Sequence, residues 1–352
     1  MDKPLQGQVA LVAGATRGAG RGIARELAAA GAKVWCTGRS TRERSATPGR
    51  PETIEETAEL IAAEGGEAVA VRVDHTIEAE VAALARRLRE DDGRLDVLVN
   101  DIWGGDEMVD WAAKFWAQDI EKARKLVDQA VFSHLITARH LAPMMVAANQ
   151  GLIVEVTDGE MPGYRGQVVY DFVKAAAIRL AYAFAWDLAG TGVTALAITP
   201  GFLRSEAMLD RFGVSEANWR DAAKEHWDFQ FSETPRFLGR AVAALAADSK
   251  VGRKSGIALN VGDLAEEYGF DDADGSRPHF WRNVDGWLET QIAEDGELKG
   301  KARRMAQARY VQIHPSAAHA AKARRFAEKL GMRGLGAGLR PLDVAAPRRD
   351  GD

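Results

Sequence analysis

Short apolar runs alternate with longer amphipathic stretches from Val9 to Val261. The runs are rich in β-branched residues and lack the polar alternation of a sheet with one wet face, so each indicates a strand covered on both faces. We predict strands at Val9–Val12, Lys33–Thr37, Ala68–Val73, Leu95–Val99, Leu152–Val156, Val193–Ile198 and Ala258–Val261. Helical spacing between them predicts helices at Arg21–Ala30, Pro51–Ala63, Ile77–Glu90, Glu121–Ala138, Tyr170–Leu188 and Arg236–Ala247.

Alternating strands and helices joined by right-handed crossovers form a doubly wound parallel sheet. The predicted fold class is therefore α/β, a Rossmann-type sheet of about seven strands with a helical C-terminal extension. We expect a main domain at 1–275, which includes a lid at 202–235, and a basic extension at 276–352 with helices near 297–310 and 316–330. A polar loop at 40–50 follows the second strand.

Charge is distributed unevenly along the 352 residues, whose net charge is −5. In the extension Lys and Arg outnumber Asp and Glu by 15 to 9, whereas the acids prevail by 42 to 31 elsewhere. An acidic body repels a phosphate backbone, so we expect no nucleic-acid partner. Cys36 is the only cysteine, which excludes an intrachain disulfide and fits a reducing compartment.

Neither a membrane span nor a secretory leader is expected. No apolar run reaches the roughly 18 residues that a spanning helix needs, and the first residues lack the apolar core of a signal peptide. We therefore expect a cytoplasmic protein without a membrane partner. No grouping in the sequence predicts a metal site.

A glycine-rich turn joins the first predicted strand to the first helix. It reads Gly14-Ala15-Thr16-Arg17-Gly18-Ala19-Gly20. Gly14 permits the tight turn, Gly18 lets the backbone approach a pyrophosphate, and Gly20 lets the helix pack on the strand. The start of the helix offers free N–H groups and a positive dipole end to phosphates. A dinucleotide site is the prediction, with Thr16 and Ala19 among its contacts.

The second predicted strand ends in Cys36-Thr37-Gly38-Arg39-Ser40, without the acid that usually binds the ribose of NAD. Arg39 and Arg17 can instead hold a 2′-phosphate with their planar guanidinium groups. The predicted cofactor is therefore NADP(H), with Ser40 beside it. Asp74 follows the third strand and can accept a hydrogen bond from the adenine amino group, although a simple turn role competes. His75 is expected to form a wall of the cofactor pocket.

Tyr170 and Lys174 lie one helical turn apart on the same face. A free tyrosine titrates near pH 10, so acid–base work at neutral pH requires a lower pKa. The ammonium of Lys174 favours the phenolate and can also donate to the nicotinamide ribose. We predict that this pair transfers the proton in a reaction that uses the nicotinamide.

Taken together, the glycine turn, Asn100 after an apolar strand, Tyr170-x-x-x-Lys174 and the run Pro200-Gly201-Phe202-Leu203-Arg204-Ser205 resemble the short-chain dehydrogenase/reductases over about residues 5–265. The resemblance implies that Tyr170 is the general acid/base, that Asn100 braces the sheet beside the cofactor, and that Ser205 contacts the nicotinamide carboxamide next to Pro200 and Gly201. Trp103-Gly104-Gly105 also resembles the subgroup that contains dehydrogenase/reductase family member 1. The family commonly forms homodimers or homotetramers through the helices Glu121–Ala138 and Tyr170–Leu188.

Three positions depart from the family pattern. The family's catalytic serine stands thirteen residues before the tyrosine, where this chain has Thr157, which we expect to orient the substrate oxygen. An alignment shifted by one residue puts Asp158 there, and its carboxylate would disfavour an oxyanion. Asn100 is followed by Asp101, Ile102 and the large indole of Trp103. The helix Glu121–Ala138 has no asparagine for the family's proton relay, which leaves Gln129 or Ser133 to hold a water.

Aromatic residues gather in the loops after the fourth and sixth strands, where ligands of open α/β sheets bind. We predict an apolar pocket whose substrate contacts include Trp103, Asp158, Phe202 and Trp219. The predicted function is an NADP(H)-dependent oxidoreductase that acts on a carbonyl/secondary-alcohol pair of an apolar small molecule. A non-catalytic NADP-binding sensor or scaffold, and an isomerase or dehydratase on the same fold, are the alternatives.

Overall fold

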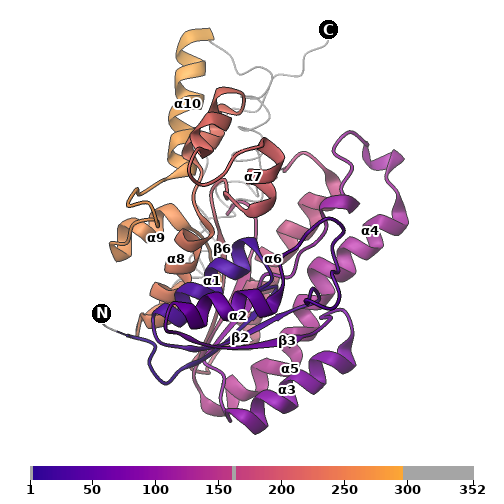
Figure 1. Cartoon of the computed structure of the whole chain (residues 1–352), viewed down its shortest axis with the longest axis vertical. Coiled ribbons are helices and arrows are strands. Elements are labelled where there is room, and N and C mark those ends of the chain that lie inside the picture. Colours follow the sequence, from indigo (N-terminus) through magenta and orange to yellow (C-terminus); the bar gives the residue numbers. More distant parts are fainter. Residues whose placement is uncertain (1–2, 161–163, 296–352) are drawn as a thin grey trace, which may run out of the picture.

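A single parallel sheet of seven strands, in the order β3-β2-β1-β4-β5-β6-β7, forms the centre of the described chain (Figure 1). The computed structural model describes residues 3–160 and 164–295. All seven predicted strands are present, each within about two residues of its predicted bounds. They are β1 Val9–Ala13, β2 Lys33–Gly38, β3 Glu67–Arg72, β4 Val97–Asn100, β5 Gly151–Val156, β6 Val193–Thr199 and β7 Ala258–Asn260.

Helices cover both faces of the sheet, so the doubly wound α/β prediction is confirmed. One core lies between the sheet and α1, α2, α8 and α9, and the other lies between the sheet and α3, α5 and α6. Thr53 caps α2, as its sequence spacing indicates, by accepting a hydrogen bond from the Glu56 N–H at 3.1 Å. The bounds are α1 Gly18–Ala29, α2 Ile54–Ala63, α3 Glu78–Asp91, α6 Val168–Asp187, α8 Pro235–Ala247 and α9 Val261–Tyr268.

The segment after β4 differs from its prediction. Instead of one helix at Glu121–Ala138, the chain forms α4 (Ile120–Val127), a π-helical turn (Asp128–Phe132) and α5 (Ser133–Ala148). α5 continues past Pro143 because Leu141, Met144 and Met145 bury against the sheet. Their burial outweighs the single hydrogen bond that a proline removes.

The predicted lid folds onto the first part of the C-terminal extension. It contains α7 (Glu206–Phe212) and two short 3₁₀ turns, and it packs against α10 (Phe280–Asp295) (Figure 1). Phe280 contacts Phe202 with ring centroids 6.2 Å apart, and Trp287 lies 4.2 Å from Trp227. The start of the extension is thus attached to the lid. The helices predicted near 297–310 and 316–330 lie outside the described residues.

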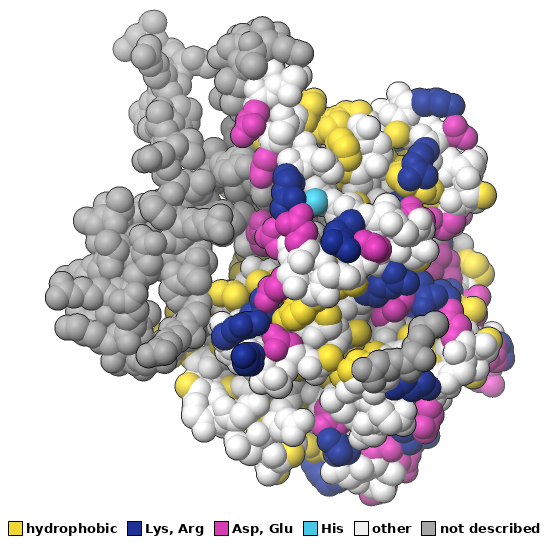
Figure 2. Space-filling view, turned by 90° about the vertical axis from the view of Figure 1, so that its left-hand side faces the viewer, with side chains coloured by type: hydrophobic (Ala, Val, Ile, Leu, Met, Phe, Trp, Pro, Cys, Tyr) yellow, Lys and Arg dark blue, Asp and Glu magenta, His cyan; other side chains and the backbone are white. Residues whose placement is uncertain are grey.

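Charges of both signs are interspersed on the face that Figure 2 shows. Several basic side chains of the described residues form ion pairs: Arg282 pairs with Glu266 at the surface, and Arg236–Glu26 and Lys254–Glu267 each include one buried partner. Among the described helices, none combines the length and apolar character needed to cross a membrane.

Helices α1 and α8 cross at a pair of glycines that the sequence analysis did not single out. A Cβ atom on Gly22 would lie 2.2 Å from the carbonyl oxygen of Pro235, and one on Gly239 would lie 2.4 Å from the carbonyl oxygen of Gly22. Only hydrogen atoms fit at these points. The two glycines therefore set how closely α8 approaches α1, the helix that starts at the glycine turn.

We expect Gly22→Ala to lower the free energy of unfolding by about 1–3 kcal/mol, because the added methyl group forces α1 and α8 apart. Denaturant unfolding of the full chain measures this. Gly286→Ala is the matched control: Gly286 lies inside α10 with open space at its Cβ position, so alanine should stabilise by up to about 1 kcal/mol. Equal effects of the two substitutions would contradict the close α1–α8 contact.

Candidate functional site

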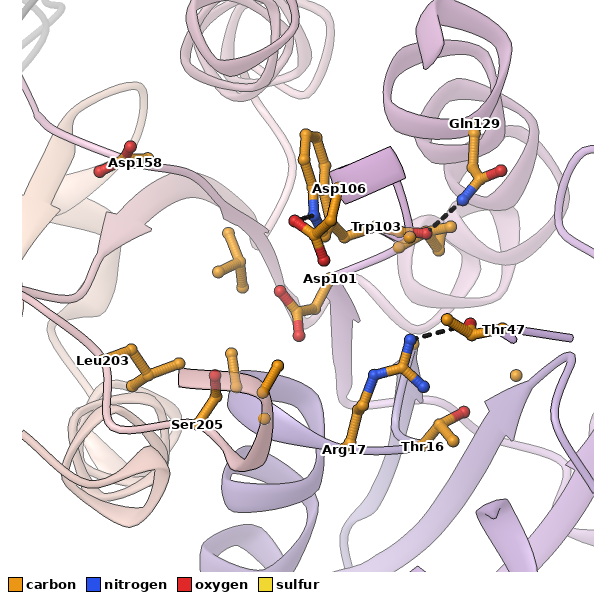
Figure 3. Close-up of a pocket in the computed structure, with 18 of the residues that line it drawn as sticks. Thr16, Arg17, Thr47, Asp101, Trp103, Asp106, Gln129, Asp158, Leu203 and Ser205 are labelled. Atoms are coloured by element: carbon orange, nitrogen blue, oxygen red, sulfur yellow. Dashed lines mark hydrogen bonds between the residues drawn. The ribbon is translucent and has the colours of Figure 1, made fainter. Parts of the chain in front are cut away.

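A cavity of ≈ 420 Å³ opens at the carboxyl ends of the strands, the edge where open α/β sheets bind ligands. The glycine turn, the loop after β4, the start of α6 and the Pro200–Ser205 segment all contribute to its wall. Every residue predicted for the catalytic, cofactor or substrate sites lines this cavity except Gly20, Asn100 and Trp219. Residues more than 180 positions apart in the sequence, such as Arg17 and Ser205, thereby face one space (Figure 3).

At Gly14 the glycine turn lies against the end of β4 with no room for a side chain. Gly14 has a φ of +98°, and a Cβ atom there would lie 2.2 Å from the carbonyl oxygen of Asp101. At Gly20 a Cβ atom would lie 2.3 Å from the carbonyl oxygen of Gly14. Gly20 thus supports the turn from behind and does not line the cavity. The resulting cradle of bare backbone fits a diphosphate.

The start of α1 already attracts an anionic group. The N–H of Gly18 donates to Oε2 of Glu206 at 2.8 Å, and the Arg21 guanidinium lies 3.6 Å from the same carboxylate. A carboxylate at this point reflects the positive end of the helix dipole. Glu206 was not among the predicted site residues, although it directly follows Ser205, the residue predicted to contact the nicotinamide.

Two arginines face the cavity where β2 ends. Arg17 donates from Nη2 to Oγ1 of Thr47 at 2.9 Å, which places its guanidinium against the 40–50 loop (Figure 3). Arg39 lines the cavity and makes no hydrogen bond or ion pair with residues 3–160 or 164–295. Ser40 is buried and accepts a hydrogen bond from the N–H of Ala46 at 3.1 Å. The Arg39 guanidinium acts on the Asp74 carboxylate only through space, so its N–H donors fit a phosphate ester.

His75 and Asp74 lie at the end of β3. The ring nitrogens of His75 each contact a threonine hydroxyl at 2.8 Å, on Thr37 and on Thr137. Burial lowers the pKa of His75 to about 3, so the ring is neutral at physiological pH. This agrees with its predicted place in the wall. Asp74 lines the cavity while its carboxylate accepts hydrogen bonds from Thr76.

Tyr170 donates its hydroxyl hydrogen to Oδ2 of Asp158 at 2.6 Å. Burial and the neighbouring Asp158 carboxylate raise the pKa of Tyr170 well above 10. This corrects the prediction that Lys174 makes the phenol acidic. The phenol holds its proton because the nearest charge is negative and little water reaches it. The end of α6 that carries Tyr170 is capped by Gln167, whose side chain accepts from the Tyr170 N–H.

The Lys174 ammonium lies 4.2 Å from the centre of the Trp103 indole ring, within the range of a cation–π contact. Burial lowers the pKa of Lys174, while the carboxylates of Asp158, Asp101 and Asp106 oppose that shift. Within the part of the chain that the structure describes, Nζ makes no hydrogen bond. Its donors are therefore available to a ligand in the cavity.

The thirteen-residue spacing predicts that Thr157 is the residue at the serine position beside Tyr170, but in the structure Asp158 takes that position. The Thr157 hydroxyl is buried and donates to the backbone carbonyl of Lys174 at 2.7 Å, which ties the end of β5 to α6. Asp158 is the residue that reaches the Tyr170 hydroxyl. The alignment shifted by one residue therefore fits the geometry, and Thr157 is not placed to orient a substrate oxygen.

Beneath the cavity Asn100 belongs to a buried polar network. Its Nδ2 donates to Oε1 of Glu155 at 2.7 Å, and Oε2 of Glu155 lies 2.5 Å from Nδ1 of His134. Nε2 of His134 contacts the carbonyl of Ile102 at 3.2 Å. Burial lowers the pKa of His134, but the Glu155 carboxylate, the Ile102 carbonyl and Asp101 together outweigh it, and the net shift is upward. The network joins β4, β5 and α5 under the site.

Glu155 and His134 were missed as partners of Asn100, although an acid inside the apolar run Leu152–Val156 was a visible signal. The two residues that could have replaced the relay asparagine are engaged elsewhere. Gln129 donates to the carbonyl of Trp103 at 2.6 Å, and Ser133 donates to the carbonyl of Gln129 at 2.6 Å.

Two further acids point into the cavity from the loop after β4, Asp101 and Asp106 (Figure 3). Burial raises the pKa of Asp101 to about 7, although Lys174, His134 and the Gly20 N–H favour its carboxylate form. Asp106 accepts a hydrogen bond from Nε1 of Trp103 at 2.9 Å. Neither acid was predicted as a site residue, because loop composition alone does not say where a side chain points.

The predicted aromatic contacts divide between the cavity and the lid. Trp103 and Phe202 line the cavity, and the edge of Trp103 meets Tyr170 with ring centroids 5.6 Å apart. Trp219 is instead buried inside the lid, with the Arg204 guanidinium 4.0 Å from its ring centre. It packs the lid and does not line the cavity, which corrects its prediction as a substrate contact.

Comparisons with known proteins agree with this arrangement. The family model for short chain dehydrogenase matches residues 8–212. Dehydrogenase/reductase SDR family member 1 of Mus musculus is 35% identical over 85% of this chain and 93% of its own length, and the Homo sapiens protein is 34% identical over 78% and 86%. Among solved structures, a protein assigned as an NAD(P)-dependent gluconate 5-dehydrogenase of Beutenbergia cavernae, holding NADP at low occupancy, is 27% identical with a TM-score of 0.57, over 73% of this chain and 96% of its own. The chain therefore belongs to the short-chain dehydrogenase/reductase family and is similar to its family member 1.

Proposed function

We propose that the protein is an NADP(H)-dependent oxidoreductase that transfers a hydride between the nicotinamide and a carbonyl/secondary-alcohol carbon of an apolar small molecule. The observation that carries this proposal is that Tyr170 and Lys174 share one cavity with the glycine turn. A proton donor, a free ammonium and a diphosphate cradle in one space are what such a reaction needs.

The nicotinamide supplies or accepts the hydride when it is bound, and the chain supplies the proton and the orientation. Tyr170 exchanges the proton with the substrate oxygen, and its raised pKa keeps that proton in place for reduction. Lys174 donates to the ribose hydroxyls, and Ser205 contacts the carboxamide. Thr157 and the Asn100 network act as positioning residues beneath them.

Trp103 and Phe202 provide the apolar wall against which the substrate binds. The lid 202–235 closes over it, and its attachment to α10 sets the position of Phe202. We assign the protein to the cytoplasm, in line with its single buried thiol.

Replacing Tyr170 by Phe should lower turnover by about a hundredfold or more, because the proton donor is lost. The measurement is NADPH oxidation with a panel of hydrophobic ketones and aldehydes, together with NADPH binding by calorimetry, which should be nearly unchanged. Tyr164→Phe is the matched control, since Tyr164 is exposed and should tolerate the change. Full activity of the Tyr170 variant would refute the assignment.

The preference for NADP(H) is assigned to Arg39 and Arg17, and it agrees with the NADP found in the Beutenbergia cavernae relative. Arg39→Gln should raise the KM for NADPH by about tenfold or more while leaving the KM for NADH nearly unchanged, because only NADPH carries the 2′-phosphate. Arg42→Gln serves as the control, since Arg42 pairs with Glu59 on the surface. If both cofactors respond equally, Arg39 does not read the phosphate.

A second candidate, an NADP-binding sensor without turnover, is favoured by one observation, the carboxylate of Asp158 beside the Tyr170 hydroxyl. The same panel distinguishes the two. NADPH binding without oxidation by any substrate would support the sensor.

We propose a homodimer or homotetramer that forms through the faces of α5 and α6. Large apolar side chains are exposed there, among them Leu135 at 42% and Phe172 at 56%. Phe172→Glu should shift the mass measured by analytical ultracentrifugation towards the monomer, because a buried charge disfavours the contact. Phe115→Glu, at an exposed position of the loop after β4, should leave the mass unchanged. An unaltered mass for Phe172→Glu would exclude this face.

A further inference from the structure

Asp158 gives the reacting end of the cavity an unusual hydrogen-bonding character. An ionised carboxylate only accepts hydrogen bonds, whereas a carbonyl oxygen needs donors. The Asp158 carboxylate lies 2.6 Å from the hydroxyl of Tyr170, the group proposed to reach the reacting atom of the substrate. A substrate atom that contacts both side chains is therefore better matched if it carries a hydrogen of its own.

Charge points in the same direction. Hydride addition to a ketone builds negative charge on oxygen, and a carboxylate beside that oxygen opposes it. Hydride addition to a protonated imine builds no negative charge on nitrogen, because the hydride neutralises the positive charge that the substrate already carries. A neighbouring carboxylate also favours the protonated form of the imine, which is the form that accepts a hydride.

The surrounding groups leave this carboxylate effective. Arg165, on the same loop, donates hydrogen bonds to the backbone carbonyls of Asp158 and Gly159 and forms an ion pair with Asp171, among other contacts. Lys174 is the other cation, and the carboxylates of Asp101 and Asp106 act on it together with Asp158. The carboxylates of Asp158 and Asp106 offset the charge of Lys174, and Asp171 offsets that of Arg165, so a cationic substrate does not meet an excess of positive charge here.

We propose that the site also reduces protonated carbon–nitrogen double bonds, with Asp158 accepting a hydrogen bond from the iminium N–H and making such cations the preferred substrates. This inference rests on the hydride transfer proposed above. Asp158 acts here as a specificity-determining residue. The faces of Trp103 and Phe202 accommodate the apolar part of the substrate.

The reaction balances without an added proton. The iminium carbon accepts a hydride, two electrons and one hydrogen nucleus, from the reduced nicotinamide. The π electrons of the C=N bond become the lone pair of nitrogen. The products are a neutral amine, which keeps the hydrogen on nitrogen, and the oxidised nicotinamide. The Tyr170–Asp158 hydrogen bond need not break during this step.

A matched pair of substrates tests the proposal with the full chain and NADPH. Dihydroisoquinoline is a cyclic imine, and α-tetralone is a ketone of similar size and shape. The wild-type protein should reduce the imine with a kcat/KM at least about tenfold above that of the ketone. Asp158→Asn should lower the imine value by about tenfold to a hundredfold, the size expected for a charged hydrogen bond. Asp158→Ser should raise the ketone value.

A binding measurement reports on the same contact without turnover. Calorimetry with the NADP⁺-loaded protein should detect binding of the product tetrahydroisoquinoline, which is an ammonium ion in neutral water. Asp158→Asn should weaken this binding by about tenfold or more. Thermal unfolding and NADPH affinity of both variants show that they fold. Glu107→Gln removes an exposed charge from the loop after β4 and should change neither the selectivity nor the binding.

The outcomes separate this inference from the proposed function. Ketone preference in the wild type, or amine binding that does not depend on Asp158, would overturn the inference and leave the oxidoreductase standing. If neither substrate oxidises NADPH although the cofactor binds, the hydride transfer fails and the reduction of imines fails with it. If the amine still binds in that case and its binding depends on Asp158, the cavity is a cation-binding site without the proposed reaction.

Discussion

The chemistry proposed for this cavity depends on one contact, the hydrogen bond between Tyr170 and Asp158. A buried phenol that donates to a carboxylate holds its proton more tightly, because burial and the negative charge of Asp158 both raise the pKa of Tyr170. The Lys174 ammonium does not bring the pKa of Tyr170 down. It lies against the indole ring of Trp103, and its own pKa is lowered by burial. Asp101 and Asp106 line the same cavity as Asp158 and Lys174, so the electrostatic potential of the site is set by several charges together.

The same cavity rests on a buried polar support. Asn100, Glu155 and His134 have almost no exposed surface and join three elements through two short hydrogen bonds. Removing one partner of such a network leaves a buried polar group without a hydrogen bond, which is costly. The three residues therefore hold one another in a single conformation. Thr157 adds a second tie from β5 to α6 through the Lys174 carbonyl. The hydrogen bond from Thr157 therefore fixes the backbone of Lys174 relative to β5.

On the opposite side the lid and the start of the C-terminal extension form one apolar cluster. Phe202 contacts the cavity with one part of its surface and Phe229 and Phe280 with others. A change in the packing of α10 would thus reach the substrate wall through a single ring.

Sequence patterns determined the seven strands, the doubly wound order and the glycine turn, because local periodicity and turn chemistry encode them within a few residues. They also found most residues of the cavity, since parallel strands bring their carboxyl ends to one edge. Only the tertiary structure decided that Asp158 and not Thr157 reaches Tyr170, and that Trp219 packs inside the lid. It also decided that Glu155 and His134 form the buried network under the site, and that Glu206 accepts from the start of α1. Those outcomes depend on where a side chain points after a strand ends and on contacts between residues far apart in the chain, and neither leaves a periodic signal.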